Sequence, residues 1–190
     1  MFSVLFCVFG FSTQAAKALG ATVIATVSTD AKAEIARAHG ADHVINYSDI
    51  DKESIGDRVK ELTNGVGAHA VFDGVGKDTW LGSLKALRKR GTLVLFGNAS
   101  GPVPVVDPLL LSKHGSLFMT RPTLFDHLLD RAELEERVEE VFRWIAEGKM
   151  KISVYKTFKL EEVADAHRCI ESREATGKIL VAIAPEEDAQ

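Results

Sequence analysis

The sequence predicts an α/β protein in which a Rossmann-like, doubly wound parallel sheet is followed by an α+β tail. Short apolar, strand-like runs alternate with amphipathic helical runs from Phe2 to Thr120. Strands that alternate with helices need crossover connections, and crossovers produce a parallel sheet. Glycine also ends most helical runs, because a left-handed residue suits a helix end. These turn glycines are Gly20, Gly40, Gly65, Gly91 and Gly115.

The elements of the first part follow in regular order. The first run, residues 2–9, is apolar except for Ser3, as in a strand buried on both faces of a parallel sheet. The same run also resembles a short signal-peptide core, but no basic segment leads it, so the strand is favoured. We expect strands at residues 2–9, 21–27, 43–45, 68–73, 92–96 and 116–120, and helices at residues 12–19, 31–39, 54–62, 79–88 and 108–113.

The pattern changes after Pro122. Asp130 with Glu133 predicts a capping box at the start of a helix whose apolar residues recur at helical spacing. The later elements lack the regular alternation of the first part. Residues 1–122 are therefore predicted as one domain and residues 123–190 as an incomplete part of a second. The tail is expected to hold a helix that ends before Gly148, a strand at 151–160, a helix at 161–172 and a strand at 178–183.

Composition argues against several classes of protein. The 190 residues are 46% hydrophobic and 26% charged, which is ordinary for a globular protein. A net charge of −4 argues against nucleic-acid binding, and no apolar run reaches the ~20 residues of a membrane span. Cys7 and Cys169 are too few for a disulfide framework or a four-cysteine zinc site, which indicates a reducing, cytoplasmic compartment. The scattered histidines lack metal-ligand spacing, so no metal site is predicted.

Ligands of an open parallel sheet bind at the carboxyl ends of its strands, so the residues after each strand form the candidate site. Ser28 follows the second strand, and Lys32 lies one helical turn further on. A hydroxyl and a cation suit an extra phosphate, whereas an acid directly at the strand end would favour a free ribose hydroxyl. The nearest acid is Asp30, two residues past Ser28. Alternatively, Ser28 caps the next helix and Lys32 is solvated.

The other strand ends carry weaker signals. Tyr47 follows the third strand, where it could contact an adenosine group or serve as a half-buried anchor. Gly74 and Gly76 follow the fourth strand and would let the backbone approach a ligand closely. This glycine pair is weak evidence, because Thr79 stands where a third glycine would fall. Phe96 ends the fifth strand, and Gly97 and Asn98 follow it. Thr120 ends the sixth strand, and Arg121 follows it.

Several motifs together resemble one family. From about Gln14 to Ile183, the chain is similar to the zinc-independent quinone oxidoreductases, the zeta-crystallin-like branch of the medium-chain dehydrogenase/reductase superfamily. The motifs agree with that family in order and spacing. They are AKALGATVIATVST, HGADHVINY, VFDGVGKDTW, LKALRKRGTLVLFGNASG, LLSKHGSLFMTRPTL and IESREATGKILV.

The resemblance implies a metal-independent enzyme that transfers a hydride from NADPH to a quinone or another electron-poor alkene. It makes residues 1–122 the NADP-binding domain and residues 123–190 the end of a barrel-like (GroES-like) catalytic domain whose N-terminal part is missing. It also implies a homodimer through the edge of the Rossmann sheet, at residues 116–120. The implied cofactor contacts are Ser28, Lys32 and Tyr47 at the adenosine phosphate, Gly74, Phe96, Gly97 and Asn98 on the nicotinamide side, Thr120 and Arg121 beside the carboxamide, and the C-terminal Arg173 and Lys178. No catalytic residue is assigned.

The first turn departs from the family pattern. The family carries a glycine-rich turn where this chain has the segment Val4–Gly10, and Phe6, Cys7 and Phe9 replace its glycines. Bulky side chains would fill the space that a pyrophosphate needs. We therefore expect a truncated quinone oxidoreductase with weak NADPH binding and low activity. The alternative is a degenerate Rossmann domain that acts as a non-catalytic binding or oligomerisation module.

Overall fold

The computed structural model describes residues 3–6, 10–48, 50–172 and 175–183. The chain divides into two compact units, Met1–Met150 and Lys151–Gln190. Within the described ranges, no helix is both long enough and apolar enough to cross a bilayer.

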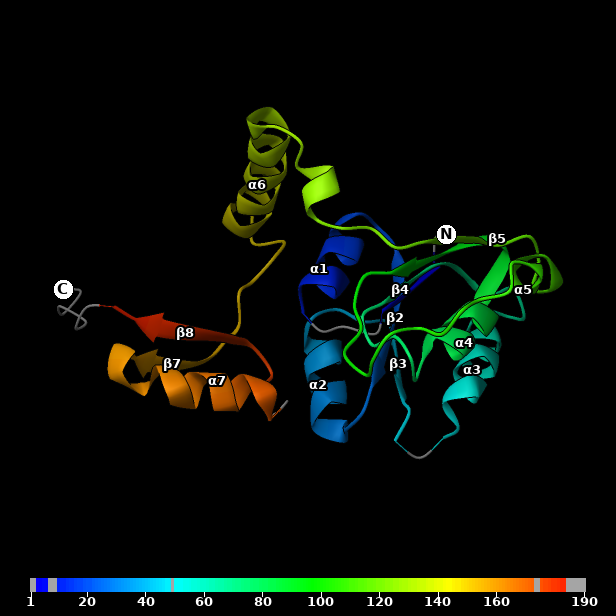
Figure 1. The fold of residues 1–190 in the computed structure, drawn as a ribbon, viewed down its shortest axis with the longest axis horizontal. Coiled ribbons are helices and arrows are strands. Elements are labelled where there is room, and N and C mark those ends of the chain that lie inside the picture. The colour runs from blue at the N-terminus through cyan, green and yellow to red at the C-terminus, as the bar shows by residue number, and fades with distance from the viewer. Residues whose placement is uncertain (1–2, 7–9, 49, 173–174, 184–190) are drawn as a thin grey trace. The chain divides into compact units, whose positions relative to one another are not determined.

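The first unit contains a six-stranded sheet in the order β3-β2-β1-β4-β5-β6, and all its neighbouring strands are parallel (Figure 1). The chain adds strands outward from β1 to β3, then crosses to β4 and adds strands in the other direction. This reversal between β1 and β4 makes the sheet doubly wound, so the predicted fold class is confirmed. The strands are β1 (Ser3–Phe6), β2 (Thr22–Val27), β3 (His43–Asn46), β4 (Ala68–Asp73), β5 (Leu87–Leu95) and β6 (Phe118–Thr120).

Helices cover both faces of this sheet (Figure 1). In β2, Val23, Ala25 and Val27 are buried with residues of α1 and α2. The intervening Ile24 is buried on the other face in one cluster with Ile55 of α3 and with residues of α4. A strand covered on both faces is mostly apolar and does not alternate with polar residues; the polar positions of β2 are two threonines, Thr22 and the buried Thr26. The helices are α1 (Phe11–Ala18), α2 (Asp30–Ala38), α3 (Ile55–Leu62), α4 (Trp80–Lys85) and α5 (Leu109–Lys113).

The expected helix at 79–88 is wrong at its C-terminal end, because α4 stops at Lys85 and β5 begins at Leu87. Leu87 pairs with Ala68, and a register shift follows before the regular ladder resumes. Arg90 takes a positive φ of 59° at the irregularity. Lysine and arginine favour helices, but pairing with β4 overrides that local preference.

Two glycines allow α3 and α4 to approach their neighbours closely. A Cβ at Gly82 of α4 would lie closer than 3.0 Å to the carbonyl oxygen of Lys52. A Cβ at Gly56 of α3 would lie 2.7 Å from the Cβ of Lys85. No side chain fits at such distances. Because both positions are glycine, α4 can pack closely against α3 and against the turn that precedes α3.

After β6 the chain forms a 3-10 turn, Phe125–His127, and the long helix α6 (Arg131–Ala146). The predicted start of this helix is confirmed, since Asp130 Oδ1 accepts a hydrogen bond from the Glu133 amide at 2.9 Å. The Glu133 carboxylate accepts from the Leu129 amide at 3.1 Å, one residue before the cap. Several large apolar side chains of α6 are exposed: Leu134, Val138, Val141 and Phe142.

The second unit is one parallel strand–helix–strand element. β7 (Val154–Lys159) and β8 (Lys178–Ala182) pair in parallel, and α7 (Val163–Glu171) connects them after a 3-10 turn, Leu160–Glu162. Phe158 and Ala166 are buried between sheet and helix. The assignment of residues 123–190 to an incomplete catalytic domain stays a prediction. The exposed apolar residues of this unit are Ile152, Val154, Tyr155, Leu160, Val163, Ile170, Leu180 and Ile183.

Two histidines of the first unit should make stability depend on pH. Burial, followed by the charge of Arg88, lowers the pKa of His69 below its ordinary 6.5, and Ser3 N donates to His69 Nδ1 at 3.2 Å. Burial, followed by Lys85 and Lys60, lowers the pKa of His114 below 6.5. The unfolded chain then binds more protons, so we expect stability to be complete above about pH 6.5 and to fall as the pH drops through the folded pKa values.

Urea unfolding at about pH 7.5 and about pH 5 would measure this loss. The double variant His69→Asn, His114→Gln should lose less stability between these two pH values than the natural chain. An equal loss in both proteins would contradict the assignment to these two side chains.

Candidate functional site

The candidate residues of the first unit lie at one edge of the sheet. Ser28, Tyr47 and Gly74 directly follow β2, β3 and β4, and Phe96 directly follows β5. Because all the strands are parallel, their carboxyl ends share this edge, beside the switch between β1 and β4. Gly97 and Asn98 continue the turn after β5, while Thr120 ends β6 and Arg121 follows it.

The two C-terminal candidates do not belong to the first unit. Arg173 lies outside the described residues. Lys178 is the first residue of β8, in the second compact unit. Their roles as cofactor contacts stay predictions.

Ser28 and Lys32 form a polar corner after β2. Lys32 Nζ donates to Ser28 Oγ at 3.4 Å. The side chain that caps α2 is Thr29, whose Oγ1 accepts from the Lys32 amide at 3.3 Å. The alternative that Ser28 is the helix cap is therefore wrong, and its hydroxyl stands beside the ammonium group instead. A hydroxyl next to a cation is a suitable pair for a phosphate group.

Asp30, the acid that follows Ser28 most closely in the sequence, is held by a neighbouring strand end. Asn46, the last residue of β3, donates from Nδ2 to Asp30 Oδ1 at 2.8 Å. Asn46 Oδ1 in turn accepts from the Ser48 amide at 3.1 Å and from the Ser48 hydroxyl at 2.8 Å. These bonds fix the Asp30 carboxylate to the β3 side. The sequence offered no local signal for this contact, because Asp30 and Asn46 are distant along the chain.

Tyr47 is half-buried and packs against the main apolar core. Its amide donates to the carbonyl of Val27 at 2.9 Å, which extends the pairing of β2 and β3 beyond the last strand residue. The structure thus supports the anchor role that was left open for this side chain. A contact with adenosine stays a prediction.

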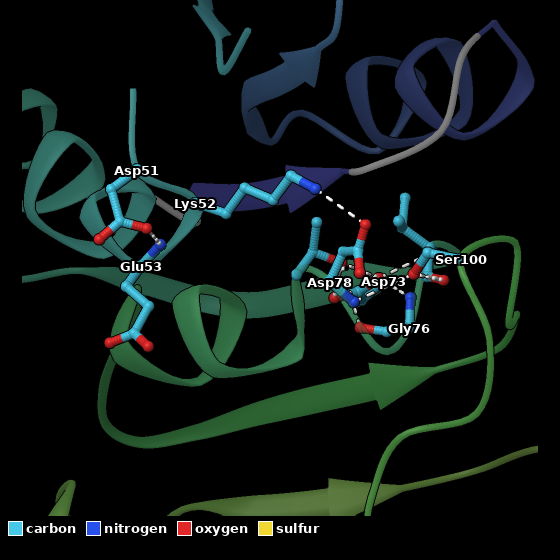
Figure 2. A network of polar contacts seen from close by, with 9 residues as sticks. Asp51, Lys52, Glu53, Asp73, Gly76, Asp78 and Ser100 are labelled. Atoms are coloured by element: carbon cyan, nitrogen blue, oxygen red, sulfur yellow. Dashed lines mark hydrogen bonds and ion pairs between the residues drawn. The ribbon is translucent and has the colours of Figure 1, made fainter. Parts of the chain in front are cut away.

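A buried carboxylate organises the turn after β4 (Figure 2). The side chain of Asp73 is fully buried, and its Oδ1 accepts from the amides of Val75 at 2.8 Å and Gly76 at 3.0 Å. Its Oδ2 accepts from the hydroxyls of Thr79 and Ser83, each at 2.8 Å. Sequence reasoning missed this network because it treated Thr79 only as a missing glycine. The available signal was an aspartate at a strand end with hydroxyl residues at helical spacing after it.

The turn after β4 is bonded along its length to the turn after β5. The amides of Ala99 and Ser100 donate to the carbonyls of Gly74 and Val75 at 3.2 and 2.8 Å. A Cβ at Gly97 would lie closer than 3.0 Å to the carbonyl oxygen of Gly74. Glycine at position 97 is therefore required by the contact between the two turns.

Side chains reinforce this pair of turns (Figure 2). Ser100 Oγ donates to the Val75 carbonyl at 2.8 Å and accepts from the Asp78 amide at 3.0 Å. Lys52 forms an ion pair with Asp78 at 2.8 Å, which ties the segment before α3 to the same turn. Phe96, Asn98, Thr120 and Arg121 are exposed at this edge.

The atypical first turn lies largely outside the described residues. Cys7 and Phe9 belong to that gap, and Phe6 is described only as the last backbone position of β1. Gly10 has a positive φ of 79° immediately before α1. The consequence of bulky residues here for a pyrophosphate stays a prediction. Within the ranges that the structure describes, no three His, Cys, Asp or Glu side chains come together as a metal site.

The doubly wound sheet, with its candidate residues at the strand ends beside the switch point, is that of a dinucleotide-binding Rossmann domain. The profile of the family described as zinc-binding dehydrogenase matches residues 10–147. The chain belongs to this family, among its quinone oxidoreductases, and the family predicted from the motifs is confirmed.

Individual relatives agree with this assignment. A quinone oxidoreductase of Pseudomonas aeruginosa is 44% identical over 171 residues, which are 90% of this chain and 52% of that protein. A 2-haloacrylate reductase of a Burkholderia species is 44% identical over 169 residues, 87% of this chain and 49% of that protein. The solved Escherichia coli quinone oxidoreductase complexed with NADPH matches with a TM-score of 0.87 at 41% identity, covering 95% of this chain and 56% of that one. The chain spans about half the length of the curated relatives that it matches.

Proposed function

We propose that this chain is the cofactor-domain part of an NADPH-dependent quinone oxidoreductase, which transfers a hydride from NADPH to a quinone or a related electron-poor alkene. The observation that carries the proposal is the Ser28–Lys32 corner, where an ammonium and a hydroxyl stand 3.4 Å apart at the end of β2. The relatives named as quinone oxidoreductases and 2-haloacrylate reductase support the substrate class.

The donors present fit NADPH. Lys32 and Ser28 supply a cation and a hydroxyl for the adenosine phosphate, while Asn46 holds the carboxylate of Asp30, which lies two residues after Ser28 in the sequence. A dinucleotide binds across a doubly wound sheet at the switch point. Its nicotinamide half is therefore expected to contact the turns after β4 and β5. Bound NADPH supplies the hydride. The residues proposed to orient that half are Gly74, Phe96, Gly97, Asn98, Thr120 and Arg121, with Tyr47 at the adenosine and Arg173 and Lys178 from the C-terminal part.

A second candidate is a non-catalytic binding or oligomerisation module. Phe6, Cys7 and Phe9 in place of a glycine-rich turn favour it, because the pyrophosphate needs close approach to the backbone there. We also propose a cytoplasmic location. The low cysteine content supports a reducing compartment.

Titration of the chain with NADPH and with NADH, followed by fluorescence, tests the proposal. We expect weak binding, with NADPH preferred over NADH. Sub-micromolar NADPH affinity would contradict the view that the altered first turn weakens the site. Failure to bind either nucleotide would favour the non-catalytic module.

We propose that the chain pairs with a second copy through β6. Among the described strands, β6 hydrogen-bonds only to β5, and its Phe118 and Met119 side chains are exposed. An exposed apolar sheet edge favours pairing with another strand. Light scattering should show a dimer, and Phe118→Lys should shift it toward monomer. A natural chain that is monomeric at every concentration would contradict this interface.

A further inference from the structure

The Asp73 carboxylate is fully buried and cannot touch a ligand at the strand ends. Burying a carboxylate is unfavourable unless it is hydrogen-bonded on both oxygens. Both oxygens of Asp73 are satisfied by two amides of the following turn and by the Thr79 and Ser83 hydroxyls. One side of the carboxylate thus holds the turn, and the other side holds α4.

Backbone hydrogen bonds connect the turn after β4 to the turn after β5, so the position of the first turn determines the position of the second. The Asp73 carbonyl accepts from the Phe96 amide at 3.0 Å, where the β5 turn begins. The Val75 amide is bound by the Asp73 side chain, while the Val75 carbonyl accepts from both the amide and the hydroxyl of Ser100, each at 2.8 Å. The exposed Phe96 and Asn98 lie on the segment that these bonds hold.

The Rossmann sheet consists of two mononucleotide-binding halves that meet at the switch point. Ser28 and Lys32 belong to the β1–β3 half, so the turns after β4 and β5 serve the other mononucleotide of the dinucleotide. We propose that Asp73 is a positioning residue for the nicotinamide half of the cofactor, acting through the backbone of these two turns. The inference rests on the proposed function and adds a buried residue that no ligand touches.

A purely structural role for Asp73 would weaken the whole domain and both halves of the site together. A positioning role affects only the nicotinamide half. Two ligands separate these cases, because 2′,5′-ADP engages the adenosine phosphate corner alone, whereas NADPH engages both halves. The ratio of the two affinities is therefore the informative measurement.

The test compares Asp73→Asn with the natural chain by calorimetric titration of NADPH and 2′,5′-ADP, at a temperature where melting curves show both proteins folded. Asparagine has the size of aspartate but lacks the charge and one acceptor, so turn and helix donors compete for its oxygen. We expect NADPH affinity to fall about fivefold or more, the effect of losing hydrogen bonds of ordinary strength. The 2′,5′-ADP affinity should stay within about twofold.

Ser83→Ala keeps the proposal testable should Asp73→Asn fail to fold. It removes one bond to Asp73 Oδ2 and leaves the turn amides bonded. Ser112→Ala is the matched control, since its hydroxyl bonds only to the Leu109 carbonyl within α5 among the contacts described. A selective loss of NADPH affinity in Ser83→Ala, absent from the control, supports the proposal.

Equal losses for the two ligands, or no loss for either, would overturn the positioning role of Asp73. A natural chain that binds 2′,5′-ADP but gains nothing from the nicotinamide half of NADPH would also overturn it. A natural chain that binds neither ligand would instead overturn the proposed function on which the inference rests.

Discussion

Replacing Gly82 with alanine should destabilise the first unit, although alanine is the better helix former. The gain from helix propensity is about 0.5–1 kcal/mol. The added methyl group would lie closer than 3.0 Å to the Lys52 carbonyl oxygen, a backbone atom that cannot rotate away. Overpacking of this kind costs ~1–3 kcal/mol, so the net free energy of unfolding should fall. The midpoint of urea unfolding measures the change.

Gly20→Ala is the matched control for this substitution. A Cβ at Gly20 meets nothing within 4 Å, but the residue has a positive φ of 79°. Gly20→Ala would lose stability only through its backbone conformation, whereas Gly82→Ala would lose stability because the added methyl group has no space. A raised unfolding midpoint for Gly82→Ala would show that α4 can move away from the Lys52 carbonyl, and that the close approach is not required.

Lys32→Ala should abolish most of the preference for NADPH over NADH. The Lys32 ammonium lies beside the Ser28 hydroxyl, and only NADPH carries the phosphate that this pair suits. A charge-assisted hydrogen bond contributes ~1.5–3 kcal/mol, which corresponds to about tenfold or more in affinity. NADPH affinity should therefore drop by that factor, while NADH affinity stays close to that of the natural chain. Parallel titrations of the two nucleotides give the ratio.

Lys113→Ala provides the control for a general change in charge. Lys113 is exposed at the end of α5, away from the turn after β2 along the sheet. The control should leave the NADPH-to-NADH ratio unchanged. If Lys32→Ala left that ratio unchanged as well, the corner after β2 would not select the phosphate.

The fold could be predicted because the periodicity of a parallel sheet is visible in the sequence. Mostly apolar runs such as 21–27 predict strands buried on both faces, and turn glycines such as Gly20 and Gly40 separate strands from the preceding helices. The start of β5 was not predictable in the same way. Residues 87–90 are rich in basic side chains with helical preference, and the start of β5 there depends on the pairing of Leu87 with Ala68, a contact between residues distant in the sequence.

The candidate site could be located but not assembled from the sequence. The rule that ligands meet the carboxyl ends of strands identified Ser28, Tyr47 and Gly74. Contacts between distant residues could not be read in this way. Asn46 with Asp30, and Ser100 with Val75, depend on how strands align, which one sequence does not encode locally. The choice of Thr29 as helix cap, one residue after Ser28, falls within the usual uncertainty of helix boundaries.

The central place of β1 has a consequence for the order in which the domain forms. The first strand in the chain lies between β2 and β4, and its second partner is the segment Ala70–Phe72. Pairing over such a separation requires a large loop to close, so β1 completes its ladder only after β4 has been synthesised. Until then, β1, β2 and β3 can form only one half of the sheet, and the edge of β1 that later pairs with β4 stays without its partner strand.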